Sequence, residues 1–120
     1  MRRDRQKAEK RGRKAETAAT LFLRLKGYHI LERRYRSPRG EIDIIARRRG
    51  MTSFIEVKAR KTKEEALFSL GANQRRRIEG AAEDWLNQVG FSEGDLRFDI
   101  ITVAASGIPT HITDAWRVGE

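Results

Sequence analysis

The chain has 120 residues and no cysteine, and its 26 basic against 17 acidic side chains give a net charge of +9. This length suits one domain with its own core, and the lack of cysteine excludes disulfides, zinc fingers and thiol chemistry. No apolar run approaches the roughly 18 residues of a membrane span, and no apolar segment follows the charged N-terminus as in a secretory signal, so we expect a cytoplasmic protein.

Positive charge is concentrated in the first two thirds of the chain. Residues 1–14 carry a net charge of +6, residues 15–82 carry +8, and residues 83–120 carry −5. This asymmetry predicts one face that binds a polyanion, with DNA as the expected partner, and an opposite acidic face. We divide the chain into a basic N-terminal extension at 1–13 and a single domain at 14–120.

The spacing of apolar residues predicts the elements αβββαβ followed by a trailing edge strand. Each helix ends at a glycine, Gly27 or Gly90. This order is typical of an α/β fold with a mixed sheet flanked by helices. The helices are predicted at 14–26 and 73–89, and the strands at 28–35, 41–48, 51–60, 96–104 and 110–118. The segment before residue 14 is either frayed or an extension of the first helix, and 61–72 is a predicted polar loop.

The two strands at 41–48 and 51–60 are predicted to form a hairpin, because apolar residues lie at both ends and the tip is charged and contains glycine. A turn centred on residues 49–50 pairs positions whose numbers sum to 99, which places Asp43 opposite Glu56. Directly opposed residues hold their Cβ atoms about 4.5–5.5 Å apart. Lys58 lies two positions after Glu56, so both side chains point to the same face. A β-bulge would shift this register.

Two carboxylates beside an ammonium group fit a site for Mg²⁺ or Mn²⁺ that activates water next to a phosphate. Asp43 and Glu56 would supply oxygen ligands, and Lys58 a nearby cation. Carboxylates forced together repel each other, which no fold needs for its stability. The structural alternative is that both acidic residues face water and that Lys58 is a plain surface lysine.

Five segments carry a family resemblance: residues 12–16 (GRKAE), 26–31 (KGYHIL), 40–46 (GEIDIIA), 54–60 (FIEVKAR) and 97–101 (RFDII). In order and spacing they resemble the bacterial YraN-like family (UPF0102), whose members are predicted nucleases similar to archaeal Holliday-junction resolvases. The resemblance implies a restriction-endonuclease-like core with a PD-(D/E)xK type of active site.

The resemblance also implies roles for individual residues. Asp43 would be the central metal ligand, Glu56 the second, and the backbone carbonyl of Val57 a further one. Lys58 would position or deprotonate the attacking water and offset charge in the transition state. Glu16 would join the metal directly or through water; the alternative is an ordinary solvated helix glutamate.

Gln74 matches the polar residue that opens the second helix in related nucleases and orients Lys58 or the scissile phosphate. The family usually has lysine directly before it, where this chain has Asn73, which is also a good N-cap residue. Arg34 replaces a frequent asparagine and is expected to touch no proposed ligand. The candidate phosphate contacts are Arg39, Arg60, Arg75 and Arg76.

The remaining conspicuous side chains are predicted to be structural. Asp99 is interpreted as a buried hydrogen-bond acceptor, and Gly40 as a turn residue. The other predictions are surface or core positions for His29 and His111, and core packing rather than base stacking for Trp85, Tyr35 and Phe68.

Three functions compete on this basis. The first is a Mg²⁺- or Mn²⁺-dependent endonuclease that acts on DNA, with branched or damaged structures as candidate substrates. The second is a non-catalytic nucleic-acid-binding module that keeps the nuclease fold, and the third is a basic scaffold for an acidic protein partner. Cleavage of a four-way junction would require a homodimer with two sites. The complete set of Asp43, Glu56 and Lys58 favours the endonuclease.

Overall fold

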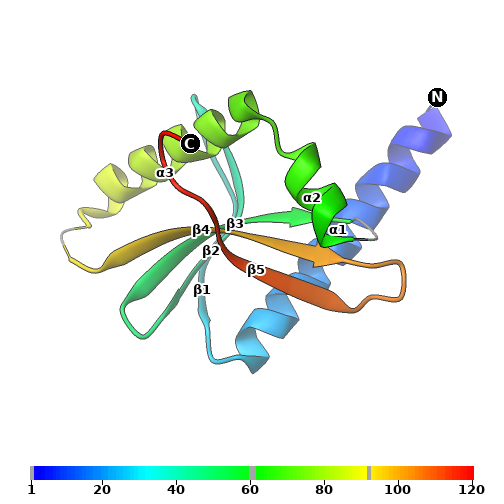
Figure 1. The fold of residues 1–120 in the computed structure, drawn as a ribbon, viewed down its shortest axis with the longest axis horizontal. Helices are drawn as coiled ribbons and strands as arrows, with labels where there is room; N and C mark the ends of the chain where they lie inside the picture. Colours follow the sequence, from blue (N-terminus) through cyan, green and yellow to red (C-terminus); the bar gives the residue numbers. More distant parts are fainter. Residues whose placement is uncertain (1, 60–61, 92) are drawn as a thin grey trace.

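The chain folds into a five-stranded mixed sheet with helices on both faces (Figure 1). The computed structural model describes residues 2–59, 62–91 and 93–120, with side chains from Gln6 onward except that of Ala8. The predicted mixed α/β fold and the order αβββαβ with a trailing strand are confirmed. The elements are α1 (Arg2–Leu25), β1 (His29–Ser37), β2 (Gly40–Arg48), β3 (Met51–Lys58), α2 (Lys63–Ser69), α3 (Ala72–Val89), β4 (Asp95–Val103) and β5 (Pro109–Trp116).

The strands lie in the sheet in chain order, β1-β2-β3-β4-β5, and all neighbours are antiparallel except β3 and β4. A parallel pair needs a crossover connection, and α2 and α3 provide it here. Because α3 belongs to this crossover, its first turn lies near the end of β3. β5 is an edge strand, as predicted.

The hairpin of β2 and β3 has the predicted register, with Ile45 opposite Phe54 and Ile44 opposite Ile55. Its two-residue turn has positive φ angles at both central positions, 51° at Arg49 and 79° at Gly50. This is the type I′ geometry, whose twist matches the twist of the flanking strands. The local sequence therefore sets which residues of the two strands face each other.

Each face of the sheet carries its own core. Alternation along the strands sends Ile44, Ile55 and Ile101 to the side covered by α1, and Ile45, Phe54 and Ile100 to the side covered by α2 and α3. The helices contribute Ala15, Ala19 and Leu23 from α1, Ala66 from α2, and Ile78, Ala81, Ala82 and Trp85 from α3. Trp85 is thus a core residue, as predicted.

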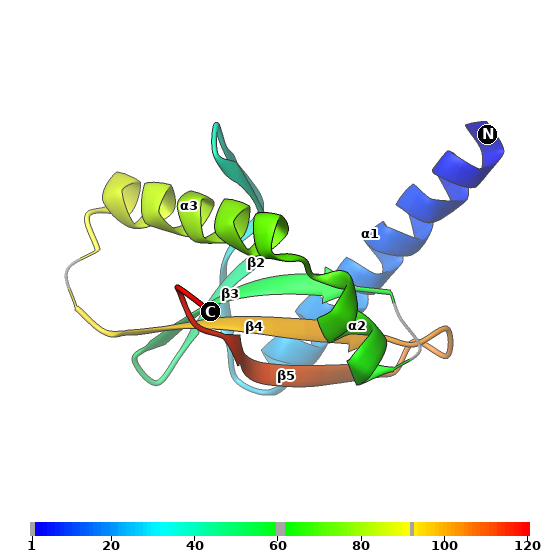
Figure 2. The same cartoon turned by 45° about the horizontal axis from the view of Figure 1, so that its top comes forward.

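α1 is longer than predicted, since it begins at Arg2, and its N-terminal half projects beyond the sheet (Figure 2). Its buried stripe also differs from the prediction. Helical spacing in 14–26 predicts an apolar stripe of Ala15, Ala18, Ala19, Phe22 and Leu25, with Leu21 alongside. The exposed fractions of Leu21 and Leu25 are 59% and 79%, whereas Leu23 is fully buried. The reason is that Ala15, Ala19 and Leu23, spaced by four, face the sheet, so Leu21 and Leu25 fall on a flank of the helix.

The segment predicted as a loop at 61–72 contains the short helix α2, so that prediction is wrong. Thr62 caps the helix by accepting a hydrogen bond from the Glu65 amide at 3.1 Å, and Ala66 packs into the core. Phe68 is 93% exposed and therefore not a core residue. The N-cap of α3 is Gly71 rather than Asn73, which lies inside the first turn. Among the described helices, none is long and apolar enough to cross a membrane.

Candidate active site

Asp43 lies where the backbone ladder between β2 and β3 stops. The paired positions end at Ile44 and Ile55. Beyond them a side chain replaces the backbone as hydrogen-bond acceptor: Asp43 Oδ2 accepts a hydrogen bond from the Val57 amide at 2.8 Å. Asp43 and Glu56 follow the last paired residues of the two strands, and each carboxyl group affects the pKa of the other, so the two lie close together. The hairpin thus brings together the two carboxylates that the sequence predicted to be neighbours.

Both carboxyl groups have raised pKa values. Burial raises the pKa of Glu56 most, the charge of Asp43 raises it further, and Lys58 lowers it in part; the result is a pKa of about 8. Burial also raises the pKa of Asp43, although the Val57 amide opposes this. Burial and the mutual repulsion of the two carboxyl groups therefore disfavour the state in which both are ionised.

Two further side chains complete the arrangement around Glu56. Lys58 Nζ lies 3.6 Å from Glu56 Oε1, and the lysine side chain is only 15% exposed. Gln74, on the first turn of α3, donates a hydrogen bond from Nε2 to the same oxygen at 3.4 Å. Glu56 is itself buried, so the alternative of two water-facing acidic residues beside a surface lysine does not hold.

Glu16 reaches the site region from α1 but is already paired with arginines. It is 6% exposed, which excludes an ordinary solvated glutamate, and its charge raises the pKa of Asp43. Arg34 Nε lies 3.1 Å from both carboxylate oxygens of Glu16, and Arg33 Nη2 lies 3.3 Å from one of them. In the described part of the chain, no group of three His, Cys, Asp or Glu residues is arranged to hold a metal.

The prediction that Arg34 would touch no proposed ligand is wrong. The register of β1 shifts between Ile30 and Glu32, and Arg34 has a φ of 53°, in the left-handed region. These two irregularities direct the Arg34 side chain to Glu16. Asparagine adopts this backbone region more readily than arginine does, which gives a physical reason for the asparagine that the resemblance implies at this position.

The arginines predicted to contact phosphate differ in whether they already bind other side chains. Arg39 pairs with Asp84 at 2.7 Å and with Glu83 at 3.3 Å, and Arg76 donates to Asn73. Arg75 is partly buried, and its Nε has no hydrogen-bond partner among the described atoms. Arg60 lies outside the described residues.

A cavity of about 410 Å³ lies beside Gln74, between the β1–β2 turn and α3. Two cations that were not singled out from the sequence, Arg36 and Arg77, line it together with Glu41. Arg36 and Glu41 form an ion pair at 3.5 Å. The position of Arg77 depends on how α3 packs against the turn, so no sequence pattern could have indicated it.

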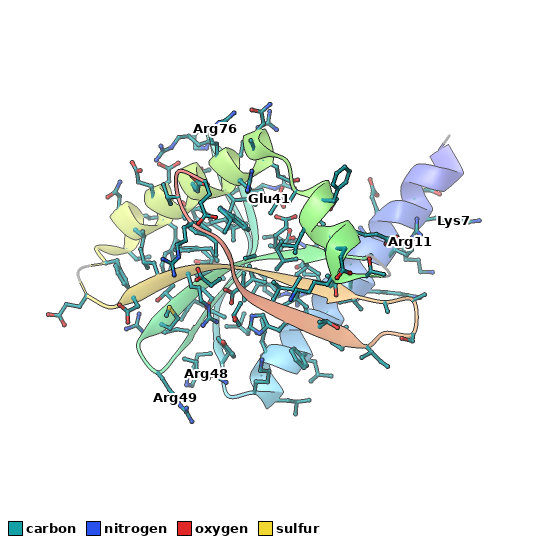
Figure 3. All side chains as sticks on the ribbon, in the orientation of Figure 1. Lys7, Arg11, Glu41, Arg48, Arg49 and Arg76 are labelled. Carbon is teal, nitrogen blue, oxygen red and sulfur yellow. The ribbon has the colours of Figure 1, made fainter. Side chains whose placement is uncertain are left out.

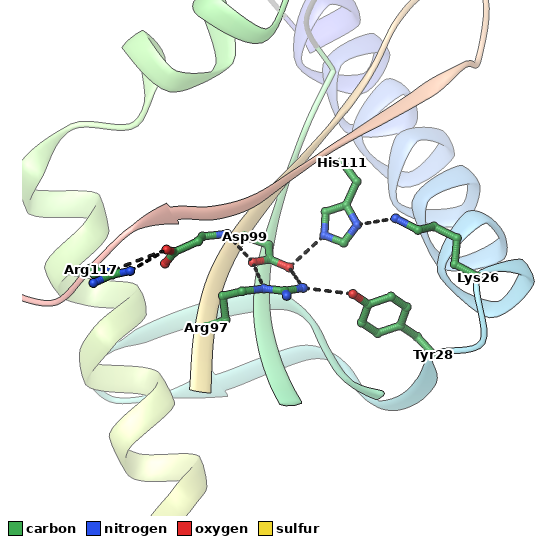
Figure 4. Close-up of polar contacts among 7 residues, drawn as sticks. Lys26, Tyr28, Arg97, Asp99, His111 and Arg117 are labelled. Atoms are coloured by element: carbon green, nitrogen blue, oxygen red, sulfur yellow. Dashed lines mark hydrogen bonds and ion pairs between the residues drawn. The ribbon is translucent and has the colours of Figure 1, made fainter. Parts of the chain in front are cut away.

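Asp99 is a fully buried hydrogen-bond acceptor, as predicted (Figure 4). It accepts hydrogen bonds from Arg97 at 2.7 and 2.8 Å and from the Asp114 amide at 3.0 Å, and it pairs with His111 at 2.8 Å. Burial alone would raise the pKa of Asp99, but these hydrogen bonds outweigh burial and lower it. His111 and Lys26 extend this network toward the end of α1, and the His111 side chain is buried. His29, by contrast, is exposed on the surface.

Residues 15–103 match the family described as "Uncharacterised protein family UPF0102". The chain is 48% identical to a UPF0102 protein of Sinorhizobium medicae over 92% of its own length and 91% of the relative. It is 45% identical to a UPF0102 protein of Mesorhizobium japonicum over 93% and 90% of the two lengths, and 45% identical to one of Paramagnetospirillum magneticum over 94% and 92%. The matched range contains every residue of the carboxylate site.

Proposed function

The chain belongs to the uncharacterised protein family UPF0102, and from the geometry of its carboxylate site we propose that it is a Mg²⁺- or Mn²⁺-dependent endonuclease. In this proposal it hydrolyses phosphodiester bonds of DNA by water attack. The observation that carries the proposal is the buried pair of Asp43 and Glu56 with Lys58 beside it. Raised carboxyl pKa values in one cluster are typical of sites that bind a cation or move a proton.

The donor set fits a divalent metal ion. Asp43 and Glu56 offer hard oxygen ligands, and their mutual repulsion would be relieved by a divalent positive charge. The carbonyl of Val57 is the further candidate ligand. When bound, Mg²⁺ or Mn²⁺ would supply Lewis-acid charge and a water of lowered pKa.

The protein's own groups have separate tasks in this proposal. Lys58 orients the attacking water and offsets negative charge that develops on the phosphate oxygens. Gln74 holds Glu56 through its hydrogen bond and so fixes the direction of that carboxylate. Glu16 anchors the guanidinium groups of Arg33 and Arg34, and these cations would reduce the repulsion of an incoming phosphate.

The basic surroundings support a polyanionic substrate. The cavity beside Gln74 presents Arg36 and Arg77, which could contact phosphate oxygens. These cations lie on the same side of the sheet as α3, so a nucleic-acid backbone that follows them passes the carboxylate pair. Branched or damaged DNA is the substrate class to test first.

The test is to incubate the pure protein with linear, flapped and four-way DNA, with and without Mg²⁺ or Mn²⁺. We expect metal-dependent cleavage that is lost in Asp43→Asn and Glu56→Gln and reduced by about a hundredfold or more in Lys58→Ala. The control is Asp95→Asn, an exposed acidic residue at the start of β4, which should cleave like the unaltered protein.

Salt-sensitive DNA binding without cleavage on any substrate would instead favour the non-catalytic binding module. Sedimentation of the same samples measures the oligomeric state, since a junction-cleaving enzyme needs two sites related by symmetry.

A further inference from the structure

One exposed flank of α1 carries a regular pattern that the proposed active site does not use. Side chains on this flank are spaced alternately by four and three residues, which keeps them in one line along a helix. We call this line the α1 flank; it consists of Lys7, Arg11, Lys14, Ala18, Leu21 and Leu25.

The α1 flank points away from the carboxylate site. A helix turns about 100° per residue, so Glu16 lies about 100° to one side of the buried Ala15, while Lys14 lies about 100° to the other side. Glu16 meets Arg33 and Arg34 of β1 on its side. The α1 flank therefore lies on the side of β4 and β5, and a partner bound there would not cover Glu16.

The flank divides into a basic half and an apolar half. Lys7, Arg11 and Lys14 are exposed, and none of them forms an ion pair with a described side chain. Figure 3 shows Lys7 and Arg11 on the projecting part of α1, apart from Arg76 and Glu41. Leu21 and Leu25 expose most of their surface.

A shallow groove accompanies the middle of the flank. It has a volume of about 280 Å³ and runs between α1 and the loop that joins β4 to β5. Small side chains line it, including Ala18 and Ala104, with Arg11 and Lys14 at its rim. Small residues in the middle of a helix face allow the backbone of a second helix to approach closely.

We propose that the α1 flank is a docking surface for an amphipathic, acidic helix of another protein. The alternating spacing of four and three is the spacing of a helix–helix seam, which selects a helical partner. The unpaired cations select acidic residues opposite the first half, and the exposed leucines select apolar residues opposite the second. This site is separate from the proposed nuclease site and does not depend on it.

Other occupants fit the flank less well. A second copy of α1 in parallel would place cations against cations, and in antiparallel orientation it would place cations against leucines. DNA offers nothing apolar to cover Leu21 and Leu25. A lipid surface would gain little from two leucines, because binding strength there scales with buried apolar area.

The experiment uses designed helical peptides and the full chain. The probe carries glutamate on the seam positions of one half and leucine on those of the other, in both possible orders. Binding is measured by fluorescence anisotropy, and its location by amide chemical-shift changes. We expect one order to bind along α1, with affinity reduced about tenfold or more by Lys14→Glu or Leu21→Asp.

Two control variants alter exposed positions elsewhere: Arg49→Glu at the hairpin tip and Leu96→Asp on β4. They should bind the probe unchanged. A probe with lysine in place of glutamate should regain binding to Lys14→Glu.

Three results would overturn the proposal. In the first, the probe binds elsewhere or not at all. In the second, sedimentation shows that the chain self-associates and that Leu21→Asp abolishes this, which would assign the flank to a second copy. In the third, duplex DNA or phosphatidylserine vesicles bind the chain more tightly than the probe does, and lose that binding in Leu21→Asp.

Discussion

At the scale of single residues, the closeness of Asp43 and Glu56 is electrostatically unfavourable when no metal ion is bound. They lie close together at the end of the paired strands, and Asp43 also accepts a hydrogen bond from the Val57 amide, which it would lose by moving away. A carboxylate pair held in this way stores electrostatic repulsion that a cation would relieve. The stability of the metal-free protein should therefore report on the site.

Replacing Asp43 with Asn should make the metal-free protein more stable at neutral pH. Asparagine keeps an oxygen for the Val57 amide but removes the charge next to Glu56. We expect the melting temperature to rise by about 3 °C or more. The rise that Mg²⁺ causes through binding to the native state should be lost at the same time.

Thermal melts of both proteins with and without Mg²⁺ measure this. A lower melting temperature together with an undiminished response to Mg²⁺ would mean that Asp43 has a structural role.

The raised pKa of Glu56 predicts a pH dependence of stability. The ordinary pKa of a glutamate is 4.5, and in the folded protein the pKa of Glu56 is about 8. Below pH 4.5 the group is protonated in both states and contributes nothing. Between pH 4.5 and 8 the unfolded chain releases this proton while the folded protein keeps it, so stability falls by up to about 1.4 kcal/mol per pH unit.

Urea unfolding of the metal-free protein from pH 5 to pH 8.5 tests this prediction. Glu56→Gln should remove the fall that is due to this group, and Glu93→Gln, at an exposed position, should keep it. Parallel curves for the unaltered protein and Glu56→Gln would show that Glu56 titrates alike in both states.

At the scale of elements, the contact between the β1–β2 turn and α3 positions Gln74. The sequence suggested that Gly40 serves the turn, but its importance lies in packing. A Cβ atom at Gly40 would lie 2.4 Å from the Arg77 carbonyl oxygen and 2.8 Å from the carbonyl carbon. Only glycine lets the α3 backbone approach the turn this closely.

Gly40→Ala should therefore displace α3 and destabilise the protein by about 1–3 kcal/mol, as overpacking does. Because Gln74 lies one helical turn from Arg77 on α3, its position should shift too, and cleavage should fall. Urea unfolding provides the stability measurement. The matched control is Gly12→Ala, whose Cβ would have no neighbour within 4 Å and which should stabilise α1 by up to about 1 kcal/mol. Equal stabilities of Gly40→Ala and the unaltered protein would contradict the packing role.

At the scale of the whole molecule, charge is separated along the chain. Residues 15–82, which contain the carboxylate site, carry a net charge of +8, and residues 83–120 carry −5. Both cations of residues 83–120 are paired within that segment, since Arg97 binds Asp99 and Arg117 binds Asp114. The charge of +8 exceeds the opposing −5, so the segment that contains the site keeps the larger, positive share.

DNA binding should weaken steeply as salt rises, with a logarithmic slope of about 0.9 for each duplex phosphate that is neutralised. Arg77→Ala should lower this slope by about 1, because Arg77 is exposed and forms no ion pair with a described side chain. Arg117→Ala should leave the slope unchanged, because that guanidinium pairs with Asp114. Binding isotherms at several salt concentrations provide the measurement. An affinity independent of salt would exclude a polyanionic ligand.

The sequence by itself determined the hairpin, the α/β order and the neighbourhood of Asp43, Glu56 and Lys58. These features depend on periodicity and on a two-residue turn, which act over a few residues and fix the register. The burial of Asp99 could also be predicted from the sequence, because its neighbours Phe98 and Ile100 are apolar and lie on a strand.

Only the tertiary structure decided the contacts between distant segments. Arg34 binds Glu16, Gln74 binds Glu56, and the backbone of Arg77 packs against Gly40. These contacts depend on the angles at which the helices dock on the sheet. The same docking selected Leu23 rather than Leu25 for the core and left Phe68 in solvent. Periodicity states that a helix has an apolar side, but the surface it packs against decides which residues of that side are covered.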